Sequence, residues 1–148
     1  MTDGVEERLL AAYLRTHFRV TGVAVPFDLQ IGRYSEELAS LHAVCSVSTS
    51  SFITAWNPRS VKQDARWNQE TQARLETELR ALSVSMVAGI GEDPCGQWEG
   101  EPSVLVLGIS RLEAERIGRS YGQNAIVWCG KDAVPELLVL SATSGATE

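Results

Sequence analysis

The segment SFITAWNPRS, Ser51 to Ser60, begins as a buried strand and then breaks abruptly. Its first six residues are rich in β-branched and aromatic side chains, which predicts a strand over residues 51–56. Pro58 lacks a backbone N–H and biases the preceding Asn57 toward an extended conformation, so the strand must stop there. Asn57 offers both a donor and an acceptor. It either orders the turn by bonding to neighbouring backbone, which is the expectation, or binds a ligand.

The elements after this segment follow a regular order. An apolar stripe over residues 64–82, uninterrupted by glycine or proline, predicts a long helix. Ser110, with Glu113 three residues later, predicts a capping box and a second helix that ends near Tyr121. Further strands are expected over residues 84–90, 103–109, 123–128 and 136–140.

From Ser51 onward the predicted order is β-α-β-β-α-β with one extra strand. That order is typical of a ferredoxin-like split layer, a mostly antiparallel sheet with two helices on one face. A helix over residues 5–16, a strand over 26–32 and a helix over 35–44 form an N-terminal α-β-α extension of this layer. We therefore predict an α+β fold in a single domain of 148 residues, with residues 141–148 as a frayed tail.

The predicted sheet gathers polar side chains at one end. We expect residues 51–56 and 103–109 to be central antiparallel neighbours, and residues 123–128 to pair with 51–56 on the other side. The end of the first strand then lies beside the starts of the other two, together with the long turn 91–101 and the start of the long helix. The candidate binding residues at this end are Trp56, Asn57, Arg66, Asn68, Asp93, Trp98, Glu101, Ser103, Gln123 and Asn124.

Several of these candidates also have a structural interpretation. Glu101 is either a general base or the ion-pair partner of Arg66, and the ion pair is the expectation. Gln123 and Asn124 either bond at the start of their strand, which is expected, or contact a ligand. Trp98 lies in a turn that is long for a hairpin connection, and it either covers a small pocket or packs over the sheet edge.

The histidines and cysteines of the sequence match no known catalytic motif. His17 and His42 lie on apolar helix patterns and are expected to be core or surface residues, which leaves Cys95 without an assigned base. A metal site from His42, Cys45 and Cys95 matches no zinc spacing, so we predict neither a metal nor a cofactor. With Cys129 these cysteines are odd in number and contain no CxxC, which favours reduced thiols.

Composition limits the classes of partner. The chain is 44% hydrophobic and 22% charged, as in a globular protein, and its net charge of −6 disfavours nucleic acid and anionic membranes. Arg59, Lys62 and Arg66 lie close together and could bind phosphate, but a solvated helix start is the expectation. No stretch approaches the roughly 18 apolar residues of a membrane span. The acidic N-terminus lacks the basic region of a signal peptide, so a cytoplasmic location is expected.

Four sequence blocks together resemble an uncharacterised bacterial family. They are ITAWNPRS, the helix with Asn68 and Arg74, GIGEDPCGQWEGEPSVLVLGI and GRSYGQNAIVW. In that family a strand ending in TAWNP, a helix, a DP-x-G-x-W-x-EPS block and a GQNA-IVW block recur in this order. The resemblance covers roughly residues 18–140 and departs at Tyr121, where phenylalanine is usual. The family is a domain of unknown function, so it implies a grouping and no reaction.

Two functions remain open. The leading hypothesis is a non-enzymatic module that binds a protein partner or a small ligand at the polar end of the sheet, because no nucleophile–base pair can be assembled. The alternative is a hydrolase or transferase for a small nucleotide-like substrate, with Glu101 as base, Arg66 as anion clamp and Trp56 or Trp98 as stacking surface. A concave pocket at this end would favour a ligand or substrate. An exposed apolar patch or an open strand edge would favour a protein partner.

Overall fold

The computed structural model describes residues 4–140, which form four α-helices and seven strands. The helices are α1 (Gly4–Arg15), α2 (Glu36–Val44), α3 (Ala65–Ala81) and α4 (Arg111–Ser120), with a 3₁₀ turn η1 at Pro58–Ser60. The strands are β1 (His17–Val20), β2 (Phe27–Leu29), β3 (Ser50–Ile53), β4 (Ser85–Glu92), β5 (Glu101–Leu107), β6 (Ala125–Cys129) and β7 (Pro135–Val139). The predicted tail lies outside the described residues.

All seven strands belong to one antiparallel sheet, in the order β2-β1-β4-β5-β3-β6-β7. β3 lies between β5 and β6, with Ile53 opposite Val104 of β5 and Phe52 opposite Val127 of β6. The predicted pairings of the first strand with the strands at 103–109 and 123–128 are therefore confirmed. The α+β class is confirmed as well.

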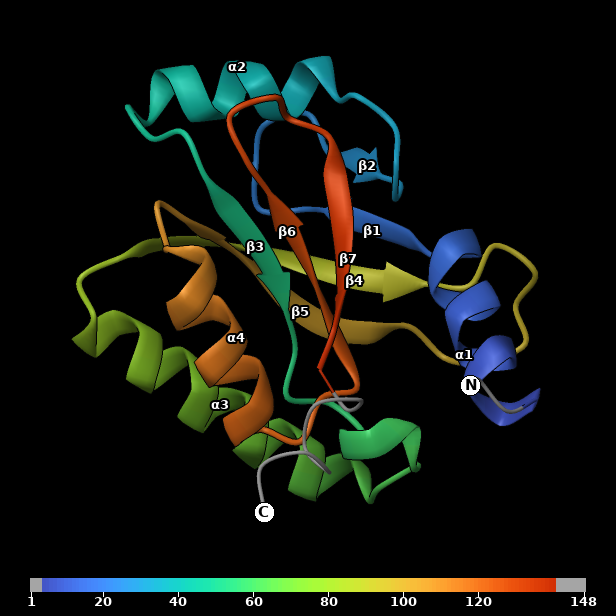
Figure 1. The fold of residues 1–148 in the computed structure, drawn as a ribbon. Coiled ribbons are helices and arrows are strands. Elements are labelled where there is room, and N and C mark those ends of the chain that lie inside the picture. The colour runs from blue at the N-terminus through green and yellow to red at the C-terminus, as the bar shows by residue number, and fades with distance from the viewer. Residues whose placement is uncertain (1–3, 141–148) are drawn as a thin grey trace.

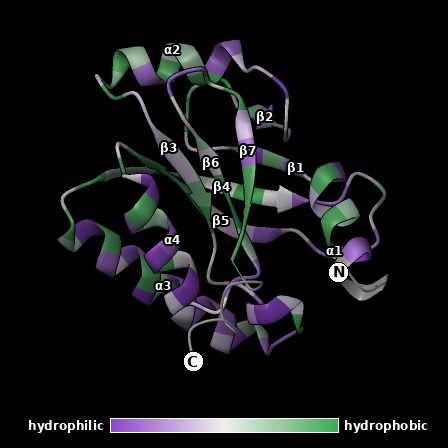
Figure 2. Cartoon of the chain, in the orientation of Figure 1, coloured by the Kyte–Doolittle hydropathy of each residue, from purple (hydrophilic) through white to green (hydrophobic). Residues whose placement is uncertain are grey.

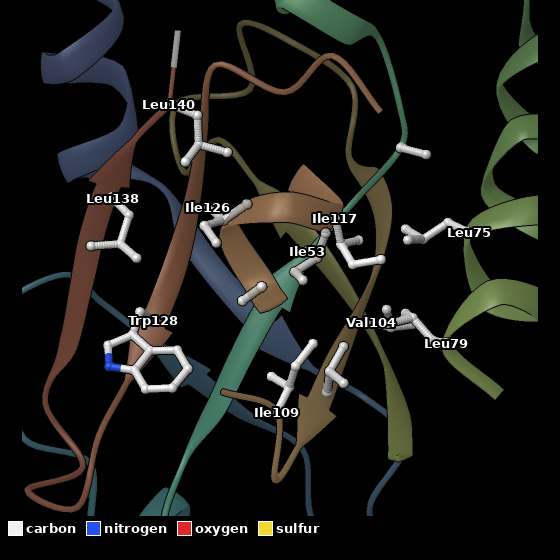
Figure 3. Close-up of a cluster of buried hydrophobic side chains, with 13 residues drawn as sticks. Ile53, Leu75, Leu79, Val104, Ile109, Ile117, Ile126, Trp128, Leu138 and Leu140 are labelled. Atoms are coloured by element: carbon white, nitrogen blue, oxygen red, sulfur yellow. The ribbon is translucent and has the colours of Figure 1, made fainter. Parts of the chain in front are cut away.

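One face of the sheet is covered by α3 and α4 (Figure 1). Figure 3 shows Leu75 and Leu79 of α3 and Ile117 of α4 directed toward Ile53 and Val104 of the sheet. In Figure 2 both helices carry alternating hydrophilic and hydrophobic bands, as expected for helices with one buried face. Both helices have an N-cap side chain that accepts a hydrogen bond from the first turn. Asp64 accepts from Trp67 N–H at 3.3 Å, and Ser110 accepts from Glu113 N–H at 3.1 Å.

The opposite face of the sheet is concave and holds a second cluster. Phe18 of β1 meets Phe52 of β3 edge to face, with ring centroids 5.4 Å apart, and Leu38 of α2 caps the cluster. The sheet curls around these side chains, and the segment after β2 contacts the chain at the start of β7: Gly32 N–H donates to the Pro135 carbonyl at 2.8 Å, and Ser35 N–H to the Ala133 carbonyl at 3.0 Å.

The sequence prediction needs three corrections in this region. β1 is a strand that the pattern missed, because HFRV is only four residues long and follows α1 directly. β2 spans three residues rather than residues 26–32. The turn predicted over residues 91–101 is shorter, since β4 continues to Glu92 and β5 begins at Glu101.

No helix within residues 4–140 combines the length and apolar character that crossing a bilayer requires.

Candidate functional site

A cavity of about 720 Å³ opens at one end of the concave face. α1, the segment after β3, the β4–β5 loop and the start of β6 contribute its walls, and Figure 1 shows α1 beside the β4–β5 loop at this end of the sheet. Seven of the predicted candidates line it: Trp56, Asn57, Asn68, Trp98, Glu101, Ser103 and Gln123.

Short side chains on the concave face keep this cavity open. Gly91 of β4 lies opposite Glu101 of β5 on one side and Phe18 of β1 on the other. Opposite residues of an antiparallel pair share a face of the sheet, so the missing side chain leaves space beside the Glu101 carboxylate. A Cβ built at Gly91 would meet only the Thr16 methyl, at 4.0 Å. Ala125 of β6 is a further short lining residue.

Asn57 is the hub of the polar wall. Its backbone N–H donates to Asn68 Oδ1 at 2.9 Å, and its Oδ1 accepts from Gln63 N–H at 2.9 Å and from Asn68 Nδ2 at 2.8 Å. Its Nδ2 donates to Glu101 Oε2 at 3.0 Å. One side chain thus joins the strand end, the first turn of α3 and the start of β5. The expected turn-ordering role of Asn57 is present in these contacts.

The predicted extended conformation of Asn57 is wrong. Its φ of 47° and ψ of 64° are left-handed, and Arg59 and Ser60 have φ values of 58° and 61°. Asparagine tolerates this region better than most residues, and its hydrogen bonds hold it there against the bias of Pro58. Gly122, with φ 68°, makes the arrangement possible: its carbonyl accepts from Arg59 N–H at 2.7 Å, and a Cβ on it would lie 2.9 Å from Pro58 Cβ.

Glu101 is half-buried, and the predicted ion pair with Arg66 is wrong. Arg66 is exposed and pairs with Glu70, its neighbour one turn along α3, at 3.4 Å. Glu101 accepts instead from Asn57. Burial raises the pKa of Glu101 above its ordinary value, and the hydrogen bond from Asn57 offsets this in part.

Tyr13 of α1 contributes a second ionisable group to the cavity. Burial raises the pKa of Tyr13, its hydrogen bond with Ser60 lowers it, and the nearby charge of Glu101 raises it. Ser60 Oγ accepts in turn from Asn124 Nδ2 at 2.9 Å. Asn124 is therefore a support for the wall and does not line the cavity.

Gln123 and Ser103 bond to the backbone around the cavity. Gln123 Nε2 donates to the carbonyls of Trp56 and Tyr121, both at 3.3 Å. Ser103 Oγ donates to the Glu101 carbonyl at 2.9 Å. These contacts fix the strand ends on both sides of the Glu101 side chain.

The β4–β5 loop supplies Trp98 but not Asp93. Trp98 lines the cavity and is 36% exposed, which places it at the rim. Asp93 closes its own turn, since its carboxylate accepts from Cys95 N–H at 3.0 Å and from Gln97 N–H at 2.7 Å.

Both histidines lie away from the cavity. His42 is buried and its Nε2 lies 2.8 Å from Ser50 Oγ, and burial lowers its pKa. His17 lies on the surface beside Asp28, at 3.5 Å. His42 is therefore a core histidine on α2 as expected, whereas His17 begins β1 and does not lie on a helix.

The three cysteines are free, with Cys45 and Cys95 exposed and Cys129 buried. Burial raises the pKa of Cys129 to about 12, so it stays a thiol. His, Cys, Asp and Glu side chains form no metal-binding group of three in the described part of the chain.

Sequence reasoning missed the contribution of the N-terminal elements. Tyr13, Thr16 and Phe18 line the cavity, but their patterns indicate only a helix and its end. Gly91 could have indicated the cavity from the sequence, because a glycine in a strand often marks a place where another group approaches the backbone.

We expect Glu101→Gln to be at least as stable as the wild type at neutral pH. Folding raises the pKa of Glu101 above its value in the unfolded chain, so protonation of this carboxyl group favours the folded state. That contribution to the free energy of unfolding is lost as the pH rises through the raised pKa. Glutamine accepts the same hydrogen bond from Asn57 and carries no charge. The other titratable residues that line the cavity, Tyr13, Lys62 and Glu99, are present in both proteins.

Urea unfolding between about pH 4 and pH 8 measures this effect. The stability of the variant relative to the wild type should increase with pH. A relative stability that decreases with pH would show that the folded protein stabilises the ionised carboxylate.

A model of one protein family matches residues 53–126, half of the chain, from the end of β3 into β6. The matched range contains Asn57, Glu101 and Gln123, and the predicted grouping with a domain of unknown function is confirmed. No curated protein and no solved structure matches the chain. The chain belongs to the family described as "Protein of unknown function (DUF3293)".

Proposed function

We propose that the protein binds a small organic molecule in the cavity at the open end of the concave face. The observation that supports this most is a cavity of about 720 Å³ that contains a half-buried carboxylate with no cation partner in the described chain. Ligand sites are commonly clefts of roughly this size, largely apolar and with a few fixed polar groups.

The composition of the walls supports a ligand-binding role. Trp56 and Trp98 supply large apolar surfaces, while Phe18 and Phe52 lie deeper on the concave face. The hydrogen bonds of Asn57 fix the carboxylate of Glu101 before any ligand arrives. A rigid polar group beside aromatic surfaces lowers the entropic cost of binding.

A small ligand is favoured over a protein partner. An open sheet edge is the usual means of adding a partner strand. Here the segment after β2 covers the start of β7 through the hydrogen bonds of Gly32 and Ser35, which leaves less of that edge open to a partner strand. The net charge of −6 continues to disfavour nucleic acid.

The second candidate function is an enzyme with Glu101 as general base. The raised pKa of Glu101 supports it, because a carboxyl group that titrates closer to neutrality exchanges protons more effectively. Arg66 cannot serve as the anion clamp from its position outside the cavity, where it pairs with Glu70. A hydrolase or transferase for a small substrate without a phosphate group fits the lining better than one for a nucleotide.

Two further proposals concern the setting of the site. The order β4-β5-β3-β6, with α3 and α4 on one face, supports a ferredoxin-like split layer within the larger sheet. Three free cysteines support a cytoplasmic location, where thiols stay reduced, and the resemblance of the sequence blocks to a bacterial family supports a bacterial source.

Filling the cavity tests the proposed function. The neutral dye N-phenyl-1-naphthylamine should bind with increased fluorescence, and Gly91→Phe should weaken its binding about tenfold or more. Residue 91 has room for a side chain, which would project beside Glu101. The matched control is Ala88→Phe, an exposed position on the same strand, which should bind the dye like the wild type. Equal dye affinity in both folded variants would rule out this cavity as the binding site.

A further inference from the structure

The carboxylate of Glu101 faces the cavity with one hydrogen bond. Its Oε2 accepts from Asn57 Nδ2 at 3.0 Å, and no Lys, Arg or His nitrogen of the described residues lies within ion-pair distance of it. An ionised carboxylate has about four acceptor sites. Burying one costs free energy unless donors or a cation complete its shell. The remaining sites are therefore available to a donor from outside the protein.

Gln123 provides a second free acceptor on the same cavity. Its amide nitrogen is already engaged with the carbonyls of Trp56 and Tyr121, whereas its oxygen accepts no hydrogen bond from residues 4–140. Gln123 is 8% exposed and lines the cavity, and the described residues contain no fully buried side-chain oxygen without a partner, so this oxygen keeps contact with solvent. A ligand that donates hydrogen bonds can use both acceptors, while a carboxylate or phosphate cannot.

The tryptophans of the cavity suit the same kind of ligand. Trp56 and Trp98 both line it. The face of an indole ring carries negative electrostatic potential and attracts cations, most strongly among the aromatic side chains. The same surfaces pack well against a flat apolar body.

The charges around the cavity also favour a cation. Its carboxylates are Glu99 and Glu101, and the ammonium of Lys62 is the one full positive charge among the described lining residues. Lys62 is exposed and forms no ion pair with Glu101. In a protein of net charge −6, the field at the cavity attracts a positively charged molecule.

On the basis of the proposed function, we infer that the ligand is a small organic cation, an amine, amidine or guanidine on a flat apolar body. Its nitrogen donates to the Glu101 carboxylate and the Gln123 oxygen, and its body packs against Trp56 and Trp98.

Three naphthyl probes of matched shape test the charge preference in the wild-type protein. They are 2-(1-naphthyl)ethylamine, 2-(1-naphthyl)ethanol and 1-naphthylacetate, which are cationic, neutral and anionic at pH 7. Calorimetric titration should give an affinity for the amine about tenfold or more above that for the alcohol, with the acetate weakest. This ranking requires no variant, so it does not depend on how a substitution affects folding.

The variant Glu101→Gln should bring the affinity for the amine down to about that for the alcohol, because the charge that distinguishes the two probes is removed. The matched control is Glu92→Gln, which removes the same charge from an exposed residue near the cavity that does not line it. It should keep most of the preference. If both variants lose it equally, net charge and not Glu101 determines recognition, and the inference is overturned.

The dye separates failure of this inference from failure of the proposed function. Binding of N-phenyl-1-naphthylamine with no preference for the amine, or with none of the three probes binding, overturns the cationic ligand and leaves the cavity as a binding site. Failure of the dye and of all three probes to bind overturns both.

Discussion

Replacing Asn57 with alanine should lower the free energy of unfolding by about 4 kcal/mol. The substitution removes the acceptor of the Gln63 N–H and the Asn68 amide, and the one donor to Glu101. Each lost partner at a half-buried site costs about 1 kcal/mol or more. Alanine also tolerates the left-handed backbone at φ 47° less well than asparagine does.

Asn57→Gly separates the two causes. Glycine adopts the left-handed region without steric cost but makes none of the side-chain hydrogen bonds. We expect the glycine variant to be about 1 kcal/mol more stable than the alanine variant, although still well below the wild type. Urea unfolding of the three proteins gives these differences. An alanine variant within about 1 kcal/mol of the wild type would contradict the role of Asn57 as the hub of the wall.

Replacing Gly89 with alanine should lower stability by about 3 kcal/mol. A Cβ there would lie 2.7 Å from Phe52 Cε2 and 2.8 Å from the Arg19 carbonyl oxygen. The carbonyl belongs to the backbone of β1, so it cannot move aside without disturbing the pairing of β1 with β4. Phe52 is also held by its edge-to-face contact with Phe18.

Gly91→Ala is the matched control on the same strand. Its Cβ would meet only the Thr16 methyl, at 4.0 Å, so we expect its stability to lie within about 0.5 kcal/mol of the wild type or above it. Thermal and urea unfolding should rank the two variants in this order. Similar losses of stability in both variants would show that the close packing of Phe52 against β4 is not the reason for a glycine at residue 89.

Local patterns in the sequence predict the central part of the fold. The apolar run before Trp56 identifies β3, and the apolar stripe over residues 64–82 identifies α3. The cap at Ser110 could be predicted because the N–H that it accepts from belongs to Glu113, only three residues along the chain. The two predicted pairings of β3 follow from the order of these elements, and they place Asn57, Glu101 and Gln123 at one end of the sheet.

The features that the sequence did not predict depend on contacts between distant segments. The curl of the sheet requires Gly32 to reach Pro135, and no local pattern encodes that approach. The wall contributed by Tyr13 follows from how α1 lies on the curled sheet. The prediction that Arg66 pairs with Glu101 failed because another carboxylate, that of Glu70, lies one turn away on the same helix.

The four tryptophans provide the most direct test of the cavity as a binding site. Trp56 and Trp98 line the cavity, whereas Trp67 is an exposed residue of α3 and Trp128 belongs to the core between the sheet and the helices. An NMR titration of the wild-type protein with N-phenyl-1-naphthylamine can be followed at the four indole N–H signals. We predict that the signals of Trp56 and Trp98 shift while those of Trp67 and Trp128 stay in place. Shifts confined to Trp67 or Trp128, or none at saturating dye, would contradict ligand binding in this cavity.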